Sequence, residues 1–194
     1  MLGESIENRM KLVCLAIAVL TILVSVGCKS TPRPQSQSTT PSPTAENYPN
    51  LTARAKELDD ALGRKDYGKV IDLTYAKVVE LGGGREKLLT EMTRQMTTME
   101  AEGVELLSST AGAPSQFLHD AGGIYAVVPV VSKLKAKDGM FQTEGSLIAI
   151  STDAGQNWTF VDATGKDQTE LKKILPNLDK LKLPPEKEPV KVAS

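Results

Sequence analysis

The residues able to carry chemistry are few, and the thiols and the imidazole come first. The chain of 194 residues contains two cysteines, Cys14 and Cys28, and one histidine, His119. Both cysteines precede the region that the hydrophobic pattern predicts to fold, so we expect neither a disulfide framework nor a cysteine-based zinc site. The sequence therefore predicts no metal centre and no cofactor, and it shows no constellation of catalytic residues.

Thioether sulfurs form the next group of reactive atoms. Met92, Met96 and Met99 recur at helical spacing. With His119 they would suit copper(I), since soft thioether ligands favour that ion. A methionine-filled seam of the core explains the same spacing, because methionine packs into irregular gaps. We take the core seam as the primary interpretation.

The composition narrows the functional classes. The net charge of −1 argues against a nucleic-acid-binding surface. Aromatic residues make up 4% of the chain, so the core must be mainly aliphatic. A length of 194 residues corresponds to about one domain.

Residues 1–27 have the pattern of a signal peptide. Residues 12–27 are apolar and uncharged, and Arg9 and Lys11 precede them. As a helix this run would extend about 24 Å, which is less than the ~30 Å hydrocarbon core of a bilayer. It therefore fits the apolar region of a signal peptide better than a membrane span. Met1 and Met10 are both candidates for the first translated residue. If translation begins at Met10, residues 1–9 are an upstream extension of the reading frame.

The segment Ser25-Val26-Gly27-Cys28 follows the apolar run. It resembles the bacterial lipobox, in which cleavage before the cysteine frees it for lipid attachment, and the resemblance implies that Cys28 carries the lipid. Ser25 departs from the aliphatic residue that the family prefers, and Ser25-x-Gly27 also suits ordinary signal peptidase. A protein anchored through Cys28 is the preferred interpretation, and a secreted protein is the alternative.

Residues 28–50 begin with that cysteine and continue as a segment rich in Pro, Ser, Thr and Gln. They have almost nothing apolar to bury, so we expect them to be disordered. The sequence thus predicts a folded domain held away from a membrane of the bacterial cell envelope. In a cell with an outer membrane, we expect that membrane to carry the anchor, with the domain facing the periplasm.

Apolar residues at helical spacing predict three helices, over 51–63, 66–81 and 85–102. Strands are predicted over 104–110, 115–120, 124–137, 140–151 and 159–162. A short helix over 167–175 and a frayed tail over 183–194 follow. Helices first and strands after them indicate an α+β fold. We expect three N-terminal helices packed on a curved antiparallel sheet of four to five strands, with a short C-terminal helix, in one domain over residues 51–182.

The two long strands, 124–137 and 140–151, form the predicted central hairpin. Asp138-Gly139 has the signature of a type I′ turn, which would place Lys133 opposite Glu144. The base of the hairpin is apolar on both faces and its tip on only one. We therefore expect the sheet to be covered at its base and open to solvent near Lys133, Lys135 and Glu144.

Two residues interrupt the pattern of these strands. Pro129 cannot donate a main-chain hydrogen bond, so it predicts an edge position or a bulge. Gly145 is a second candidate for a bulge.

The turn after the hairpin reads Ser151-Thr-Asp-Ala-Gly-Gln-Asn-Trp158. It resembles the Asp-box of sialidases and related β-propellers. We expect Asp153 to accept hydrogen bonds from turn amides, Gly155 to have a positive φ and Trp158 to pack beneath. Propellers repeat this unit in every blade, whereas it occurs once here, so a local turn is preferred over a glycan site.

The helical opening Ala61-Leu-Gly-Arg-Lys-Asp-Tyr-Gly-Lys-Val70, a long helix and a curled meander follow one another. This order is similar to the nuclear transport factor 2-like superfamily, which includes ketosteroid isomerase and polyketide cyclases. The resemblance covers about residues 51–165 and implies a cone whose curved sheet and helices enclose an apolar pocket.

Catalytic members of that superfamily place Asp, His or Tyr inside the pocket. The residues of these types here are Asp72, Tyr75, Tyr125 and His119. None of them matches a family motif, so the resemblance assigns no catalytic residue.

We therefore expect a non-enzymatic, lipid-anchored envelope protein that binds another envelope protein or a small apolar ligand. The candidate binding residues are Tyr75, Tyr125, Lys133 and Glu144. Two alternatives are an envelope enzyme that uses the same pocket and a glycan binder that uses the Asp-box hairpin.

Overall fold

The computed structural model describes residues 48–176, 180–185 and 187–193. The predicted signal peptide, the lipobox with Cys28 and most of the predicted linker lie outside the described residues. The helices are α2 (Pro49–Gly63), α3 (Tyr67–Asp72), α4 (Ala76–Leu81), α5 (Arg85–Ala101) and α6 (Gln168–Ile174). The strands are β1 (Glu105–Ala111), β2 (Gln116–Asp120), β3 (Gly123–Ala136), β4 (Gly139–Ser151), β5 (Thr159–Asp162) and β6 (Val190–Val192).

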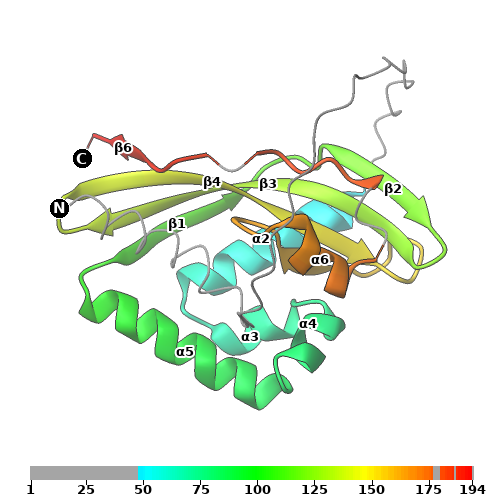
Figure 1. Ribbon diagram of the computed structural model, residues 1–194, viewed down its shortest axis with the longest axis horizontal. Helices are drawn as coiled ribbons and strands as arrows, with labels where there is room; N and C mark the ends of the chain where they lie inside the picture. Colours follow the sequence, from blue (N-terminus) through cyan, green and yellow to red (C-terminus); the bar gives the residue numbers. More distant parts are fainter. Residues whose placement is uncertain (1–47, 177–179, 186, 194) are drawn as a thin grey trace, which may run out of the picture.

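The fold is α+β, as the sequence predicts, with N-terminal helices packed against a curled antiparallel half-barrel sheet. The long strands β3 and β4 run along the whole length of the molecule (Figure 1). On the same edge of β3 lie β1 and β2, one after the other, and on the same edge of β4 lie β5 and β6. The described sheet thus has six strands, one more than expected, because β6 pairs with the tip of β4.

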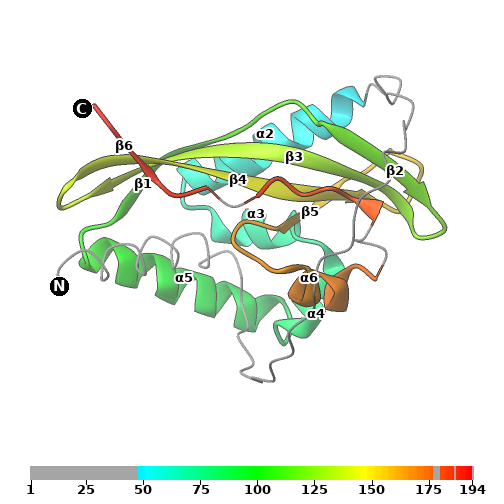
Figure 2. The ribbon, with the colours of Figure 1, turned by 45° about the horizontal axis from the view of Figure 1, so that its top comes forward.

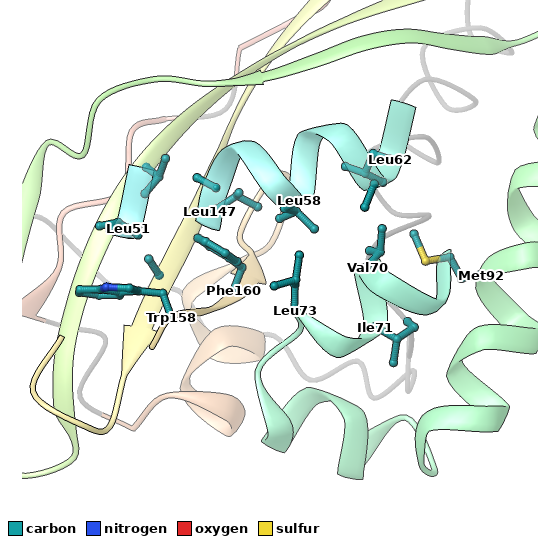
Figure 3. Close-up of a cluster of buried hydrophobic side chains, with 14 of the residues drawn as sticks. Leu51, Leu58, Leu62, Val70, Ile71, Leu73, Met92, Leu147, Trp158 and Phe160 are labelled. Carbon is teal, nitrogen blue, oxygen red and sulfur yellow. The ribbon is translucent and has the colours of Figure 1, made fainter. Parts of the chain in front are cut away.

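Two apolar cores cover the base of the sheet, one on each face. The helix-side core joins α2, α3 and α5 to the concave face, and its larger members are Leu51, Leu58, Leu62, Val70, Leu88, Met92, Met96, Met99, Leu147, Trp158 and Phe160. Several of these side chains converge from different elements in Figure 3. The outer core packs α6 and the segment after it against the other face, through Val127, Ile148, Ile150, Val161, Ala163, Leu171, Leu175 and Leu181. The prediction that the hairpin base is buried on both faces is confirmed.

Pro129 lies where the strand beside β3 is interrupted. The N–H of Gly112, just after β1, donates to the Pro129 carbonyl at 2.7 Å, and the N–H of Ser115 donates to the Val127 carbonyl at 2.9 Å. The chain leaves the edge of β3 between these two bonds. A residue without an N–H is tolerated there because no continuous ladder needs its donor.

The register of the central hairpin differs from the prediction by two residues. Ala136 pairs with Gly139, so the turn residues are Lys137 and Asp138. Neither of these has a positive φ, which excludes a type I′ turn, whereas Gly139 has φ +133°. Lys133 therefore lies opposite Gln142, not opposite Glu144.

Gly145 does not form a bulge, because the pairing of β3 with β4 is continuous through it. The shift of register lies in β1, between Leu106 and Ser108. Gly145 instead allows the close approach of Thr164, since a Cβ atom at this position would lie 2.2 Å from Thr164 Oγ1.

The predicted second helix is broken in two. Asp66 caps α3 as expected, by accepting the N–H of Lys69 at 3.0 Å. The helix then stops because residues 73–75 pair with β5. The N–H of Phe160 donates to the Leu73 carbonyl, and the N–H of Tyr75 donates to the Phe160 carbonyl, both at 2.9 Å.

The C-terminal part contains both an expected and an unexpected element. The short helix α6 is present, and Asp167 caps it by accepting the N–H of Glu170 at 2.8 Å. Within the predicted frayed tail, β6 pairs with residues 140–142 of β4. The chain reaches this strand by running along the sheet (Figure 2).

Candidate functional site

A cavity of about 70 Å³, here called the helix-side cavity, lies between α2, α3, α5 and the concave face of the sheet. Leu58 and Leu62 of α2 and Val70 of α3, three of its apolar lining residues, lie close together in Figure 3. The other apolar lining residues are Met96, Met99, Leu106, Val130 and Leu147. The helices and the strands β1, β3 and β4 thus both contribute apolar side chains to the lining.

The sheet also contributes hydroxyl groups to the lining of the cavity. Ser109 of β1 pairs with Ser132 of β3, and Ser132 pairs with Thr143 of β4. All three line the cavity. Because residues paired across antiparallel strands point to the same face, they form a row of hydroxyl groups across three strands, here called the hydroxyl row.

Two carboxyl groups, those of Asp59 and Asp162, also line the cavity. Asp59 of α2 accepts hydrogen bonds from the Ser109 hydroxyl at 3.0 Å and from the Ala111 N–H at 2.6 Å. It therefore fastens α2 to β1. Partial burial raises its pKa, against the effect of these two hydrogen bonds.

The second carboxyl group belongs to Asp162, the last residue of β5. Its side chain lines the cavity and is 8% exposed. The carboxyl accepts the N–H of Thr164 at 2.9 Å. Burial raises its pKa, because the charged form loses its hydration, while the attraction of Lys166 and the hydrogen bonds from Thr164 act in the opposite direction.

A wider hollow of about 420 Å³, here called the outer groove, lies on the other face of the sheet. Its floor comes from residues 129–131 and 144–146, and its walls come from 163–167 and from Leu183, Pro184, Pro185 and Lys187. Glu144 lies in it and forms an ion pair with Lys187 at 2.7 Å. Glu144 and Lys133 are both candidate binding residues near the predicted open tip of the hairpin. Glu144 lines the outer groove, whereas Lys133 lines neither the outer groove nor the helix-side cavity.

The two candidate tyrosines lie near each other in the outer core. Tyr75 and Tyr125 both pack against it. Burial raises the pKa of Tyr125, and Tyr75 and Asp120 add to the rise. Neither tyrosine lines the helix-side cavity or the outer groove.

Asp72 and His119 also lie away from the helix-side cavity. Asp72 is half exposed, and Arg85 pairs with it at 2.8 Å and lowers its pKa. His119 is exposed on β2, opposite Ile124. The structure therefore brings none of the four superfamily-type residues into the apolar cavity.

The methionines belong to the core, as preferred from the sequence. Met92, Met96 and Met99 are all buried in the helix-side core. Within the described residues, no group of three or more His, Cys, Asp or Glu side chains could hold a metal ion.

The Asp-box turn has the predicted local geometry. Asp153 accepts the main-chain N–H and the side-chain amide of Asn157, the hydroxyl of Ser151 and the N–H of Gln156, and these bonds lower its pKa to about 2. Gly155 has φ +86°, and its carbonyl accepts the indole N–H of Trp158 at 3.2 Å. Trp158 is 1% exposed and contacts Tyr48 edge-on. The turn thus satisfies its own polar groups and presents no aromatic face to a ligand.

Sequence reasoning missed Asp59, Asp162 and the hydroxyl row. The sequence does contain a signal for part of the hydroxyl row, because Ser132 and Thr143 occupy inward-facing positions in the alternating pattern of β3 and β4. A hydroxyl at a position that alternation assigns to the core is a polar group in need of a partner. The pairing of these residues depends on the hairpin register, which the turn signature placed wrongly.

Comparison of the chain with protein-family models and with curated proteins gives no match. None of the helices in the described part of the chain is both long enough and apolar enough to cross a membrane.

Proposed function

We propose that this chain is a lipid-anchored protein of the bacterial cell envelope whose domain binds a small ligand in the helix-side cavity without catalysis. The observation that carries the binding role is the cavity itself. It is lined mostly by apolar side chains of the helices and the sheet, with a few hydroxyl and carboxyl groups among them, and this combination is typical of sites that bury the body of a ligand and orient it by a few polar groups.

The resemblance to the nuclear transport factor 2-like superfamily supports this proposal. A half-barrel sheet with helices before it is the architecture that such a cone requires. The cavity lies where the resemblance places the pocket, between the helices and the concave face.

Ligand binding is tested by native mass spectrometry of the full-length protein purified in detergent, which would show a retained small molecule. Ser132→Phe places a ring in the cavity and should abolish retention. Lys133→Phe is the matched control, because alternation along β3 points the neighbouring side chain to the other face. Equal retention by both variants and the wild type would place the ligand elsewhere.

The anchor is supported by the lipobox-like segment Ser25-Val26-Gly27-Cys28 and the polar tether after it. Several acyl chains make such an anchor stable, at about 0.8 kcal/mol for each buried methylene. Labelled palmitate should enter the wild-type protein in cells, and Cys28→Ser should remove both the label and the membrane association. An unlabelled wild type that is secreted would show that the protein is not a lipoprotein.

An enzyme using the same cavity is the second candidate, and Asp162 is the observation that favours it. A buried carboxyl with a raised pKa in an apolar cavity can act as a general acid or base. If the retained molecule is converted to a product by the wild type but not by Asp162→Asn, the domain is an enzyme. The glycan alternative gains no support, since Trp158 is buried.

A further inference from the structure

The strand β6 covers the edge of β4 through a short and exposed pairing. It has 3 residues, with Val192 opposite Met140 and Val190 opposite Gln142. Val190 is 62% exposed, so the side chains of this strand add little buried apolar surface. The edge of β4 at the tip of the hairpin is therefore covered mainly by main-chain pairing.

The chain just before this region is held more firmly, at the base of the sheet. The N–H of Lys182 donates to Oε1 of Gln116 at 3.0 Å, and the Gln116 amide donates to the Lys182 carbonyl at 2.5 Å. Leu181 is 3% exposed within the outer core. Residues 184–193, of which the structure describes all but residue 186, follow this attachment and are here called the strap. No described residue of the strap belongs to either core, so the strap can leave the sheet while both cores stay intact.

The sequence of the strap favours an extended conformation. It contains Pro184, Pro185 and Pro189, and proline fixes φ and has no N–H to donate to a ladder. Between its attachment and β6 the chain accordingly runs along the sheet (Figure 2). A segment that is already extended loses little conformational entropy when it docks, so the strap suits an edge supplied by its own sheet or by another molecule.

The edge of β4 has two features that match the lysines of the strap. Glu144 forms its ion pair with Lys187 at 2.7 Å. At the start of β4, a Cβ atom on Gly139 would lie 2.8 Å from Cε of Lys191, so the absence of a side chain there makes room for the lysine stem. The edge therefore recognises an extended strand by charge at Lys187 and by shape at Lys191.

We infer that the strap exchanges between two copies of this chain, so that β6 of one copy pairs with the β4 edge of the other. A second copy carries the same strap, and the pairing, the ion pair with Glu144 and the fit at Gly139 all recur between copies. Exchange of an identical element requires little free energy, because the same surfaces are buried within one copy or between two. Copies held in one membrane also meet at a raised effective concentration. This interaction goes beyond the proposed function and does not involve the helix-side cavity.

The test joins the strap of one chain to the sheet of another. Two differently tagged full-length chains are coexpressed, one with Met140→Cys and the other with Val192→Cys. The two positions lie opposite each other in the register, at the separation that a disulfide bridges. Oxidation should give a disulfide-linked pair carrying both tags, at least fivefold above the control in which Thr90→Cys replaces Met140→Cys. Thr90 is exposed on α5, and the equal number of thiols makes this control a measure of chance collision.

Charge reversal across the two chains tests the recognition of Lys187. Glu144→Lys in the chain with Met140→Cys should lower the yield of the linked pair at least threefold, because two ammonium groups then face each other. Lys187→Glu in the chain with Val192→Cys should restore it. Restoration separates a charge-dependent docking site from an edge that the first substitution has simply damaged.

A single chain carrying both Met140→Cys and Val192→Cys shows where the strap docks. A disulfide within this chain, combined with a yield between chains no higher than that of the Thr90→Cys control, would overturn the exchange, because the strap then stays on its own copy. No disulfide within or between chains would overturn the docking of β6 itself. Neither result bears on the helix-side cavity, whose ligand is tested separately by retention in Ser132→Phe.

Discussion

A Cβ atom on Gly145 would lie 2.2 Å from Oγ1 and 2.8 Å from Cγ2 of Thr164. The same Oγ1 accepts the N–H of Ser146 at 3.2 Å. Thr164 thus closes the edge of β4 where β5 ends. Gly145, Thr164 and Val130 line both the helix-side cavity and the outer groove. The two hollows are therefore separated at this point by a few small side chains.

Gly145→Ala should destabilise the protein by about 1–3 kcal/mol, because the added methyl group overpacks against Thr164. Urea denaturation followed by circular dichroism measures the change. In a Thr164→Ala background the penalty should shrink, since the two closest atoms are gone. Additive costs in this double-mutant cycle would contradict the contact.

Gly63→Ala is a matched control for the same substitution. Gly63 is the last residue of α2, and nothing lies within 4 Å of an added Cβ atom. Alanine there should leave stability unchanged or raise it by up to about 1 kcal/mol, because it restricts the unfolded chain. A loss comparable to that of Gly145→Ala would show that the method does not report local packing.

Asp59→Ala should cost about 1–3 kcal/mol, because it leaves the Ala111 N–H without its acceptor and unfastens α2 from β1. Its neighbour Asp60 provides the control. Asp60 pairs with Lys56 on the surface of α2, and an exposed pair of this kind contributes about 0.5 kcal/mol or less. Equal losses for Asp59→Ala and Asp60→Ala would contradict a tie between helix and sheet.

The order of the elements and the two faces of the hairpin could be predicted because both depend on local patterns. Alternation with period two assigns each residue to a face whatever its partner is. The register error moved partners by two residues, an even number, so the faces stayed correct while Lys133 and Glu144 lost their predicted pairing. The choice between adjacent turn positions depends on backbone angles that the sequence signature does not determine.

Contacts between distant segments could not be predicted. The break between α3 and α4 is made by main-chain bonds to Phe160, far along the chain. The apolar spacing of residues 66–81 continues across that break, so local periodicity indicates one helix. The hydroxyl row likewise requires the register of three strands at once.

Trp158 should report a buried environment in solution. It is the single tryptophan of the chain, and it is 1% exposed. We expect emission at short wavelength and weak quenching by acrylamide. Trp158→Ala should lower stability by about 3–5 kcal/mol through the cavity left behind. Strong quenching in the folded protein would contradict the buried indole and reopen the glycan alternative.

Asp162→Asn should stabilise the protein by an amount that depends on pH. Burial raises the pKa of Asp162 above its ordinary value of 3.8. Between the unfolded and the folded pKa, the folded state binds more protons than the unfolded state, so the wild type loses stability as pH rises through that window. Asparagine can still accept the Thr164 N–H through its amide oxygen, and it carries no charge to bury.

Urea denaturation of both proteins between pH 4 and pH 8 measures this effect, because the contributions of groups that do not interact with Asp162 cancel in the difference between them. The variant should gain on the wild type as pH rises and then keep a constant advantage above the folded pKa. Lys166 attracts the Asp162 carboxylate, and Asp59 lines the same cavity; both residues are retained in the variant. A difference that is independent of pH would show that Asp162 ionises in the folded protein as it does in the unfolded chain.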